Sequence, residues 1–261
     1  MANIKPKSGV SLLICSHDGA EDLWYPLEKS YKKYWPDCPF DKFLLTNYKN
    51  PKTDFFKTIK IGKEVNWSDK IILALKNINT EYILLTYDDL FFKESVRTKK
   101  LLNFSKLAVD NKWSYLSFIP HIKIPNKVSD DLSILEKNRQ YRNSSPWSIY
   151  KKDVLFKILV PGESAWEFEK IGSVRSNRYE DFYSINYDFF HWHNAIVKGK
   201  WKPDILKSLM DEGIVEKTSI PSLSMSENFF KEVHMVYFDL IRKLLPIRIA
   251  YYLSRLKNYF F

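Results

Sequence analysis

Two adjacent carboxylates, Asp88 and Asp89, interrupt an apolar stretch in the first half of the chain. Ile83, Leu84 and Leu85 precede them without polar alternation, which predicts a buried strand that ends at the acidic pair. In open α/β sheets, ligands bind beyond the carboxyl ends of the strands. Side-by-side carboxylates repel each other, and a hard divalent cation such as Mg²⁺ or Mn²⁺ relieves that repulsion. The pair therefore indicates either a metal site or an acidic turn after a strand.

A second acidic cluster surrounds two aromatic residues. Glu163, Glu167 and Glu169 lie close in sequence to Trp166 and Phe168. If this segment begins a helix, both rings cannot be buried on one narrow stripe, so at least one is free to line a pocket. A carboxylate in a partly apolar pocket can act as a base toward a hydroxyl group. Acids also occur at helix N-termini because they complement the helix dipole, so both interpretations stay open.

A third candidate is the pair His191 and His193, two residues apart on a strand expected over 187–192. On a strand these side chains share a face, as metal ligands require. Two ordinary, partly buried histidines are the more common case.

The elements that position these residues alternate between strands and helices. Strands are predicted over 10–15, 43–47, 56–61, 82–87, 113–119, 146–150, 187–192 and within 195–201, and helices over 21–34, 68–75, 95–111, 152–159 and 203–210. Ser68 is expected as the N-cap of its helix, with Asp69 in the first turn. The polar stretch over 120–143 is expected to be a long active-site loop. This order predicts an α/β fold with a mainly parallel sheet flanked by helices.

Composition narrows the class of protein further. The chain has 261 residues and a formal net charge of +10, which favours an anionic partner such as nucleic acid, an acidic membrane surface or a phosphorylated small molecule. Two cysteines argue against a disulfide framework or a structural zinc site, and reduced thiols are expected. The N-terminus lacks the apolar core of a signal peptide, and no apolar run reaches about 18 residues. A cytoplasmic protein is therefore expected.

The domain organisation expected is a catalytic domain over 1–214, a Ser-rich linker over 215–229 and a C-terminal tail over 230–261. From Lys231 to Lys257 the tail carries six bases and two acids between bulky apolar residues. A basic amphipathic helical tail of this kind suits the surface of an anionic bilayer. The alternative, helices docked on the protein's own core, stays open.

With both acidic clusters described, the chain resembles nucleotide-sugar-dependent glycosyltransferases of the GT-A fold, in particular bacterial enzymes of lipopolysaccharide, capsule or O-antigen biosynthesis. Three passages carry the resemblance: VSLLICSH over 10–17, the stretch from WSDK to YILLTYDDLFF over 67–92, and PGESAWEFE over 161–169. They are similar to the strand that meets the nucleotide, to the strand that leads to the Asp-x-Asp metal motif, and to the acceptor motif that holds the base of inverting members. Here the second motif reads Tyr87-Asp88-Asp89.

The resemblance implies a role for each matching residue. Donor binding is assigned to Ser16, Asn47, Asp69, Lys70 and Asp88. The metal ion, Mg²⁺ or Mn²⁺, is assigned to Asp89 and Asp88. The catalytic base is assigned to Glu169, with Glu167 next, and acceptor binding to Trp166 and Glu163. Lys70 and basic residues of the 120–143 stretch are expected to assist at the diphosphate, namely Lys123, Lys127, Arg139 and Arg142.

The expected function is transfer of a sugar, with inversion, from a nucleotide-sugar donor to a saccharide or lipid-linked glycan acceptor in bacterial surface polysaccharide synthesis. The expected location is the inner face of the bacterial membrane, reached through the tail. Two alternatives are a metal-dependent nucleotidyl- or phosphotransferase and a non-enzymatic, basic nucleic-acid-binding protein. The basic residues are dispersed and no nucleic-acid motif is present, so no nucleic-acid partner is expected.

Overall fold

The computed structural model describes residues 9–121 and 126–224. The predicted tail over 230–261, the end of the predicted linker and Lys123 lie outside these ranges. Backbone contacts divide the chain into two compact units, Met1–Asn194 and Ala195–Phe261. The domain boundary after residue 214 stays a prediction. Within the described ranges, no helix is both long and apolar enough to cross a membrane.

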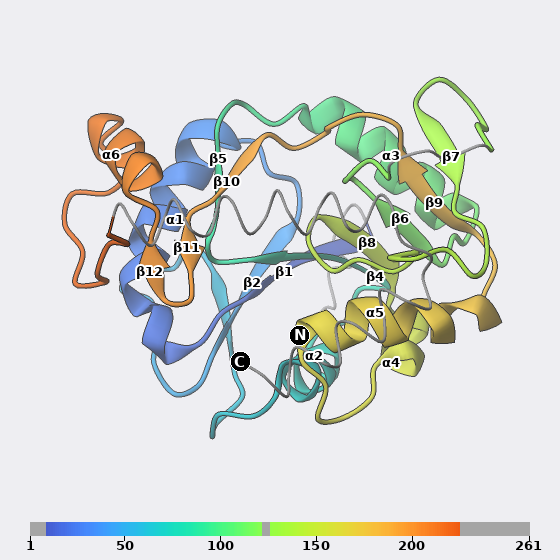
Figure 1. The fold of residues 1–261 in the computed structure, drawn as a ribbon, viewed down its shortest axis with the longest axis horizontal. Coiled ribbons are helices and arrows are strands. Elements are labelled where there is room, and N and C mark those ends of the chain that lie inside the picture. The colour runs from blue at the N-terminus through green and yellow to red at the C-terminus, as the bar shows by residue number, and fades with distance from the viewer. Residues whose placement is uncertain (1–8, 122–125, 225–261) are drawn as a thin grey trace, which may run out of the picture. The chain divides into compact units, whose positions relative to one another are not determined.

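An eight-stranded sheet in the order β3-β2-β1-β4-β8-β6-β9-β7 forms the centre of the first unit (Figure 1). Its strands are β1 Val10–Cys15, β2 Asp41–Thr46, β3 Lys57–Lys60, β4 Tyr82–Tyr87, β6 Tyr115–Ser117, β7 Leu132–Ile134, β8 Ser148–Lys151 and β9 Phe182–Ile185. The strands β3, β2, β1 and β4 pair in parallel, as do β6 and β9, whereas β8 and β7 run antiparallel to their neighbours. The predicted mainly parallel α/β sheet is confirmed.

Helices cover both faces of this sheet (Figure 1). They are α1 Glu21–Tyr34, α2 Trp67–Leu75, α3 Thr98–Asp110, α4 Lys152–Ile158 and α5 Ala165–Arg175, with short 3-10 turns at Asp18–Ala20 and Ser176–Arg178. The helices α1 and α3 lie on one face, and α2, α4 and α5 on the other. A second, two-stranded ladder joins β5 Leu90–Phe92 to β10 Trp192–Asn194 in antiparallel fashion.

The register of the parallel strands brings their carboxyl ends together. Cys15 of β1 lies opposite Tyr87 of β4, so Ser16 and Asp88 leave neighbouring strands at the same level. The next strand, β2, ends one residue before Asn47. Residues far apart in sequence therefore meet at one edge of the sheet, because parallel strands all point their carboxyl ends the same way.

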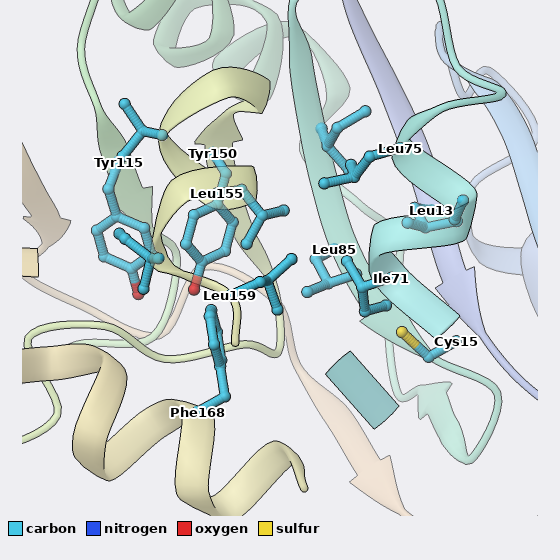
Figure 2. Packing of buried hydrophobic residues seen from close by; sticks show 14 of the residues in the cluster. Leu13, Cys15, Ile71, Leu75, Leu85, Tyr115, Tyr150, Leu155, Leu159 and Phe168 are labelled. Carbon is cyan, nitrogen blue, oxygen red and sulfur yellow. The ribbon is translucent and has the colours of Figure 1, made fainter. Parts of the chain in front are cut away.

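The core between the sheet and α2, α4 and α5 is built from alternating strand positions (Figure 2). Leu13 and Leu85 from the sheet pack with Ile71, Leu155 and Phe168 from the three helices, and all five are fully buried. Successive side chains of a strand point to opposite faces. Tyr87 follows Leu85 by two residues and packs, partly buried, against the same cluster. Its side chain therefore lies on the α5 side of the sheet.

Several element predictions need correction. The helix α2 begins at Trp67 with Asn66 in the N-cap position, so Ser68 is not the cap. The strand predicted over 187–192 is wrong, because Phe189 and Phe190 pack in an aromatic cluster with Phe118 and Trp147 and form no ladder there. The predicted loop over 120–143 contains the strand β7.

The described part of the second unit holds one hairpin and one helix. The strands β11 Ile196–Val197 and β12 Lys200–Trp201 pair antiparallel, and α6 spans Pro203–Asp211. Lys198 and Gly199 form the two-residue turn with positive φ angles of 51° and 73°. Two positive φ values are typical of the type I′ turns that join tight hairpins.

Candidate functional site

Asp88 is the buried centre of the site at the carboxyl ends of β1 and β4. Its Oδ2 accepts a hydrogen bond of 2.5 Å from Ser16 Oγ, and Ser16 Oγ in turn accepts one of 2.8 Å from Trp24 Nε1 on α1. Burial, followed by the neighbouring charge of Asp89, raises the pKa of Asp88 to about 7. Ser16 and Lys70 oppose that shift. The structure thus brings together two residues predicted for the donor, Ser16 and Asp88.

Asp89 is less buried than Asp88 and occupies the turn between β4 and β5. Among the described residues, no group of three His, Cys, Asp or Glu side chains is placed to hold a metal ion. Mg²⁺ is commonly bound through one or two carboxylates plus phosphate and water oxygens. The hard oxygen donors of Asp88 and Asp89 fit a metal of that kind, whose remaining ligands come from a phosphorylated substrate.

Asn47 is held at the end of β2 by Asp18, a residue that the sequence interpretation missed. Asp18 accepts backbone hydrogen bonds from Asn47 at 2.8 Å and from Tyr48 at 3.0 Å, and its own amide donates to Asn47 Oδ1 at 2.9 Å. Although burial opposes it, these backbone donors lower the pKa of Asp18. An acidic residue in the turn right after the first strand was the available signal, since such side chains commonly bind nearby backbone amides.

Glu64 joins two residues predicted for donor binding. Its carboxylate forms an ion pair with Lys70 Nζ and accepts a hydrogen bond of 2.8 Å from Asn47 Nδ2. Lys70 also lowers the pKa of Asp88, so its charge acts on the acidic pair. The carboxylate of Glu64 thus binds two hydrogen-bond donors, the ammonium of Lys70 and the amide of Asn47. Donors of these two kinds can also bind a phosphate or a hydroxyl group. Nothing in the local sequence around Glu64 indicated this contact.

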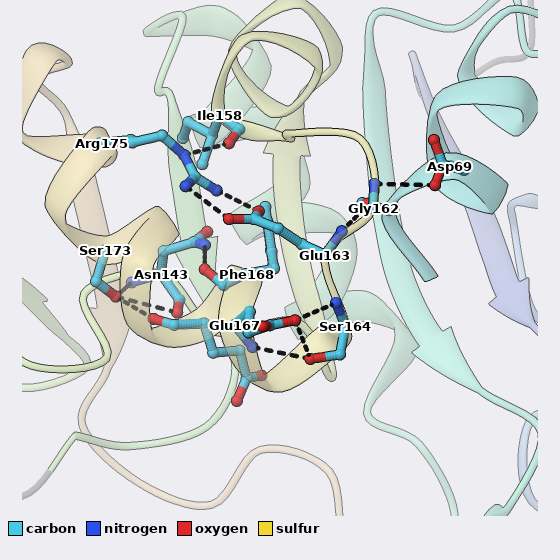
Figure 3. Close-up of polar contacts among 12 residues, drawn as sticks. Asp69, Asn143, Ile158, Gly162, Glu163, Ser164, Glu167, Phe168, Ser173 and Arg175 are labelled. Atoms are coloured by element: carbon cyan, nitrogen blue, oxygen red, sulfur yellow. Dashed lines mark hydrogen bonds and ion pairs between the residues drawn. The ribbon is translucent and has the colours of Figure 1, made fainter. Parts of the chain in front are cut away.

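Asp69, also predicted for donor binding, supports the loop before α5. Its Oδ2 accepts a hydrogen bond of 3.0 Å from the amide of Gly162 (Figure 3). Beside it, Ser68 Oγ accepts a hydrogen bond of 2.9 Å from the amide of Glu163. These bonds tie the first turn of α2 to the start of the acidic Trp motif. The structure therefore gives Asp69 a structural role.

Two of the three glutamates in that motif have structural partners (Figure 3). Glu167 forms a capping box with Ser164, the N-cap of α5, and the bonds from Ser164 lower the pKa of Glu167. Glu163 forms a two-pronged ion pair with Arg175, with distances of 2.8 and 2.5 Å. A lowered pKa counts against Glu167 as the base, and the ion pair counts against Glu163 as an acceptor ligand. Glu169 is the remaining candidate.

One of the two aromatic residues of α5 is buried and the other is exposed, as predicted. Phe168 is fully buried in the core, and Trp166 is 64% exposed. Because helix positions 166 and 168 point in different directions, only one ring can face the sheet. Trp166 is therefore available to a ligand, as expected for acceptor binding.

Glu169 is fixed by the loop before β8. Its Oε1 accepts hydrogen bonds from the amide of Ser145 at 2.7 Å, from Ser145 Oγ at 2.8 Å and from Ser144 Oγ at 3.2 Å. Ser145 Oγ also bonds to the hydroxyl of Tyr87, the residue just before the acidic pair, at 2.7 Å. The sequence interpretation missed both serines. Their only signal was a Ser-Ser-Pro turn ahead of a predicted strand.

Arg142 is predicted to assist at the diphosphate, but the structure gives its side chain a structural role. Its guanidinium is buried and donates to the backbone carbonyls of Leu135, Ser176 and Tyr179 at 2.9, 2.6 and 3.1 Å. The side chain thus ties the end of the 120–143 stretch to the turn after α5.

The two histidines predicted to share one face of a strand do not lie on the same strand. His191 lies outside β10, 3.5 Å from Glu94, while His193 lies within β10.

No protein-family model and no curated protein sequence matches the chain. Among solved structures it is similar to S. aureus TarS in complex with UDP-GlcNAc, at 12% identity and a TM-score of 0.51, over 84% of this chain and 69% of that one. This likeness shows a GT-A-like fold. In two other structures, of TarS 1–349, the chain spans 59% and 63% of the length of the chain it matches.

Two further solved structures are similar at lower TM-scores. One is the mannosyltransferase PcManGT from Pyrobaculum calidifontis in complex with GDP-Man and Mn²⁺, at 10% identity and a TM-score of 0.47, over 84% of this chain and 68% of that one. The other is a CMP:2-keto-3-deoxy-manno-octonic acid synthetase in complex with CTP, at 10% identity and a TM-score of 0.45, over 80% of this chain and 99% of that one.

Proposed function

We propose that the protein is a glycosyltransferase that moves a sugar from a nucleotide-sugar donor to a hydroxyl group of an acceptor. The observation that carries the proposal is the position of Asp88 and Asp89 at the carboxyl end of β4, beside Ser16 at the end of β1. Tyr87, the residue before the pair, is hydrogen-bonded through Ser145 to Glu169 on α5. The two aspartates suit a divalent ion that binds a donor diphosphate, and Glu169 suits an acceptor proton. A GT-A-like fold agrees with this division.

The donor half of the reaction requires charge stabilisation at the leaving diphosphate. A divalent ion, Mg²⁺ or Mn²⁺, held by Asp89 with Asp88 beside it, would supply that stabilisation when bound. Lys70 carries a positive charge close to this pair and is held by Glu64. Asn47, at the end of β2, presents its amide to the same carboxylate. In this proposal both side chains bind donor oxygens after Glu64 moves away from them.

The acceptor half of the reaction requires a base. Glu169 is partly exposed, and the donors to it among the described residues all reach Oε1. Its Oε2 is then the oxygen that takes the proton of the acceptor hydroxyl as the new glycosidic bond forms. Trp166, exposed on the same helix, offers a flat apolar face to the C–H groups of a sugar. A single base of this kind implies inversion at the anomeric carbon.

The acceptor proposed is a saccharide or a lipid-linked glycan of bacterial surface polysaccharide synthesis, and the place proposed is the inner face of the membrane. The three matching sequence motifs and the net charge of +10 support this proposal. Removing residues 230–261 should release the protein from anionic vesicles while the melting temperature stays unchanged. A truncated protein that stays on the vesicles would contradict the membrane role of the tail.

The decisive experiment is a thermal-shift screen of nucleotide sugars with and without Mn²⁺, followed by a transfer assay on the ligands that bind. A ligand that binds only the folded protein stabilises it by about 2.7 kcal/mol at 100 times its Kd. We expect a nucleotide sugar to raise the melting temperature more with Mn²⁺ than without it. Stabilisation and turnover restricted to nucleoside triphosphates would replace the proposal with a nucleotidyl- or phosphotransferase. Tight, steeply salt-dependent binding of nucleic acid would also overturn it.

A further inference from the structure

A continuous chain of hydrogen bonds links the strand that carries Asp88 and Asp89 to the candidate base. The hydroxyl of Tyr87 lies 2.7 Å from Ser145 Oγ, and Ser145 Oγ lies 2.8 Å from Glu169 Oε1. Tyr87 is the last residue of β4, so its backbone continues directly into the acidic pair. Tyr87, Ser145 and Glu169 therefore join β4, the loop before β8 and α5 through side chains alone.

The direction of each bond follows from the number of available protons. A serine hydroxyl has one proton, and Ser145 Oγ gives it to the carboxylate of Glu169. The proton between Tyr87 and Ser145 must then come from the phenol of Tyr87. A tyrosine hydroxyl is protonated at neutral pH, so it has one proton to donate. The chain thus runs in one direction, from Tyr87 to Ser145 to Glu169.

The loop that carries Ser145 is itself rigidly held. The carbonyl of Ser144 accepts hydrogen bonds from Tyr150 at 2.6 Å and from Tyr115 at 3.1 Å. Asn143 donates from its side chain to the carbonyl of Phe168 on α5 at 3.2 Å. Both tyrosines belong to strands of the central sheet. The position of Ser145 is therefore fixed relative to both the sheet and α5.

We propose that Tyr87 and Ser145 are positioning residues that hold Oε1 of Glu169 and so direct its Oε2 toward the acceptor. Through Tyr87 they also tie the position of Glu169 to β4, the strand that leads into the two aspartates. The inference rests on the proposed function, because it requires Glu169 to act as the base. Three donors on one carboxylate oxygen fix the rotation of that group. A misplacement of a reacting group by about 1 Å can cost about 100-fold in rate. Tyr87 acts only through Ser145.

The test is a kinetic double-mutant cycle on Ser145→Ala, Tyr87→Phe and the variant with both changes, using the nucleotide sugar found in the screen. Ser145→Ala should lower kcat about 10- to 100-fold. Tyr87→Phe, which removes one hydrogen bond and keeps the ring, should lower it about fivefold. The double variant should be no slower than Ser145→Ala, because Tyr87 has no other route to Glu169. The donor Kd should stay unchanged in all three.

Matched controls separate positioning from stability. Ser145→Thr keeps the hydroxyl and should restore most of the lost kcat. Ser105→Ala removes a buried serine hydroxyl on α3, and Tyr183→Phe removes a tyrosine hydroxyl on β9, and both should leave kcat unchanged. Melting temperatures of all variants identify any that fails to fold, in which case Tyr87→Phe and Ser145→Thr still carry the test.

Each outcome supports or overturns the inference. Lower kcat at constant donor Kd, with no added effect in the double variant, supports it. Wild-type kcat in Ser145→Ala, or independent and additive effects of the two changes, overturns the positioning role and leaves the glycosyltransferase proposal intact. A wild-type protein that transfers no sugar at all overturns the proposed function and this inference with it.

Discussion

Ser16 and Asp88 lie 72 positions apart in sequence and share a hydrogen bond of 2.5 Å at the carboxyl ends of β1 and β4. The bond places a neutral hydroxyl, fixed by Trp24, against a buried carboxyl group. Because Asp89 adds a second negative charge, the pair of carboxylates is poised to accept a positive partner.

The contribution of Asp88 to stability should fall with rising pH. Its pKa is about 7 in the folded protein, against an ordinary value of 3.8. Between these two values Asp88 binds fewer protons in the unfolded chain than in the folded one, so its contribution to the free energy of unfolding decreases as pH rises from about 4 to about 7. The pKa of His121, lowered to about 4 by burial, changes stability in the opposite direction over this range, so the contribution of Asp88 is the difference between wild type and Asp88→Asn. At about 1.4 kcal/mol per unit, the contribution of Asp88 amounts to roughly 4 kcal/mol. Urea unfolding at a series of pH values measures it.

The matched variants for that measurement are Asp88→Asn and Asp110→Asn. The first removes the titrating group, so its stability relative to wild type should change with pH. The second changes an exposed aspartate of α3, and its stability relative to wild type should stay constant across this range. Identical pH profiles for wild type and Asp88→Asn would contradict the raised pKa.

The effect of a divalent metal ion on nucleotide binding and turnover should depend on Asp89. Asp89→Asn keeps the size of the side chain and removes one hard, charged oxygen ligand. We expect this variant to fold, to lose the extra stabilisation that Mn²⁺ gives to the nucleotide complex, and to lose turnover. Thermal shift with nucleotide, with and without Mn²⁺, measures the first effect. Asp153→Asn, a change in an exposed aspartate of α4, is the control, and an unchanged Mn²⁺ effect in Asp89→Asn would remove the metal role.

Substitution of the two neighbouring glutamates of α5 should have different effects on kcat. Glu169→Gln removes the base and should lower kcat by a factor of about 10² to 10⁴ with little change in donor binding. Glu167→Gln should leave kcat close to wild type, because Glu167 serves the capping box. Steady-state kinetics of both variants, with donor Kd measured separately, decide between them. A large kcat loss in Glu167→Gln alone would transfer the base assignment to Glu167.

The ion pair between Glu163 and Arg175 should contribute to stability. Its side chains are 12% and 19% exposed, so removing one partner leaves the other poorly solvated. Glu163→Gln should therefore lower the free energy of unfolding by about 1–3 kcal/mol, as measured by urea unfolding. Pairing it with Arg175→Met should recover part of the loss. Unchanged stability together with weaker acceptor binding would instead restore the predicted acceptor role of Glu163.

Local sequence patterns determined the elements and the place of the acidic pair. The unbroken apolar run before Asp88 predicted β4, and the strand ends where the carboxylates begin. The predicted and observed bounds of α1 coincide at Glu21–Tyr34. The spacing of Trp166 and Phe168 determined that one ring would stay outside the core. These predictions hold because hydrophobic periodicity depends only on residues close in the chain.

Only the tertiary structure decided which polar side chains meet. Arg142 looks like a loop base in the sequence, yet its guanidinium is buried and donates to one nearby carbonyl and to two from a segment more than 30 residues away. The resemblance assigns the base to Glu169 with Glu167 next, and only the fold shows the partners of the three glutamates: Arg175 for Glu163, the capping box for Glu167 and the serine loop for Glu169. Strand order and helix packing set these partners, and neither is encoded in local periodicity. The sequence thus determined where the carboxylates lie along the chain, and the fold decided which of them remain available for chemistry.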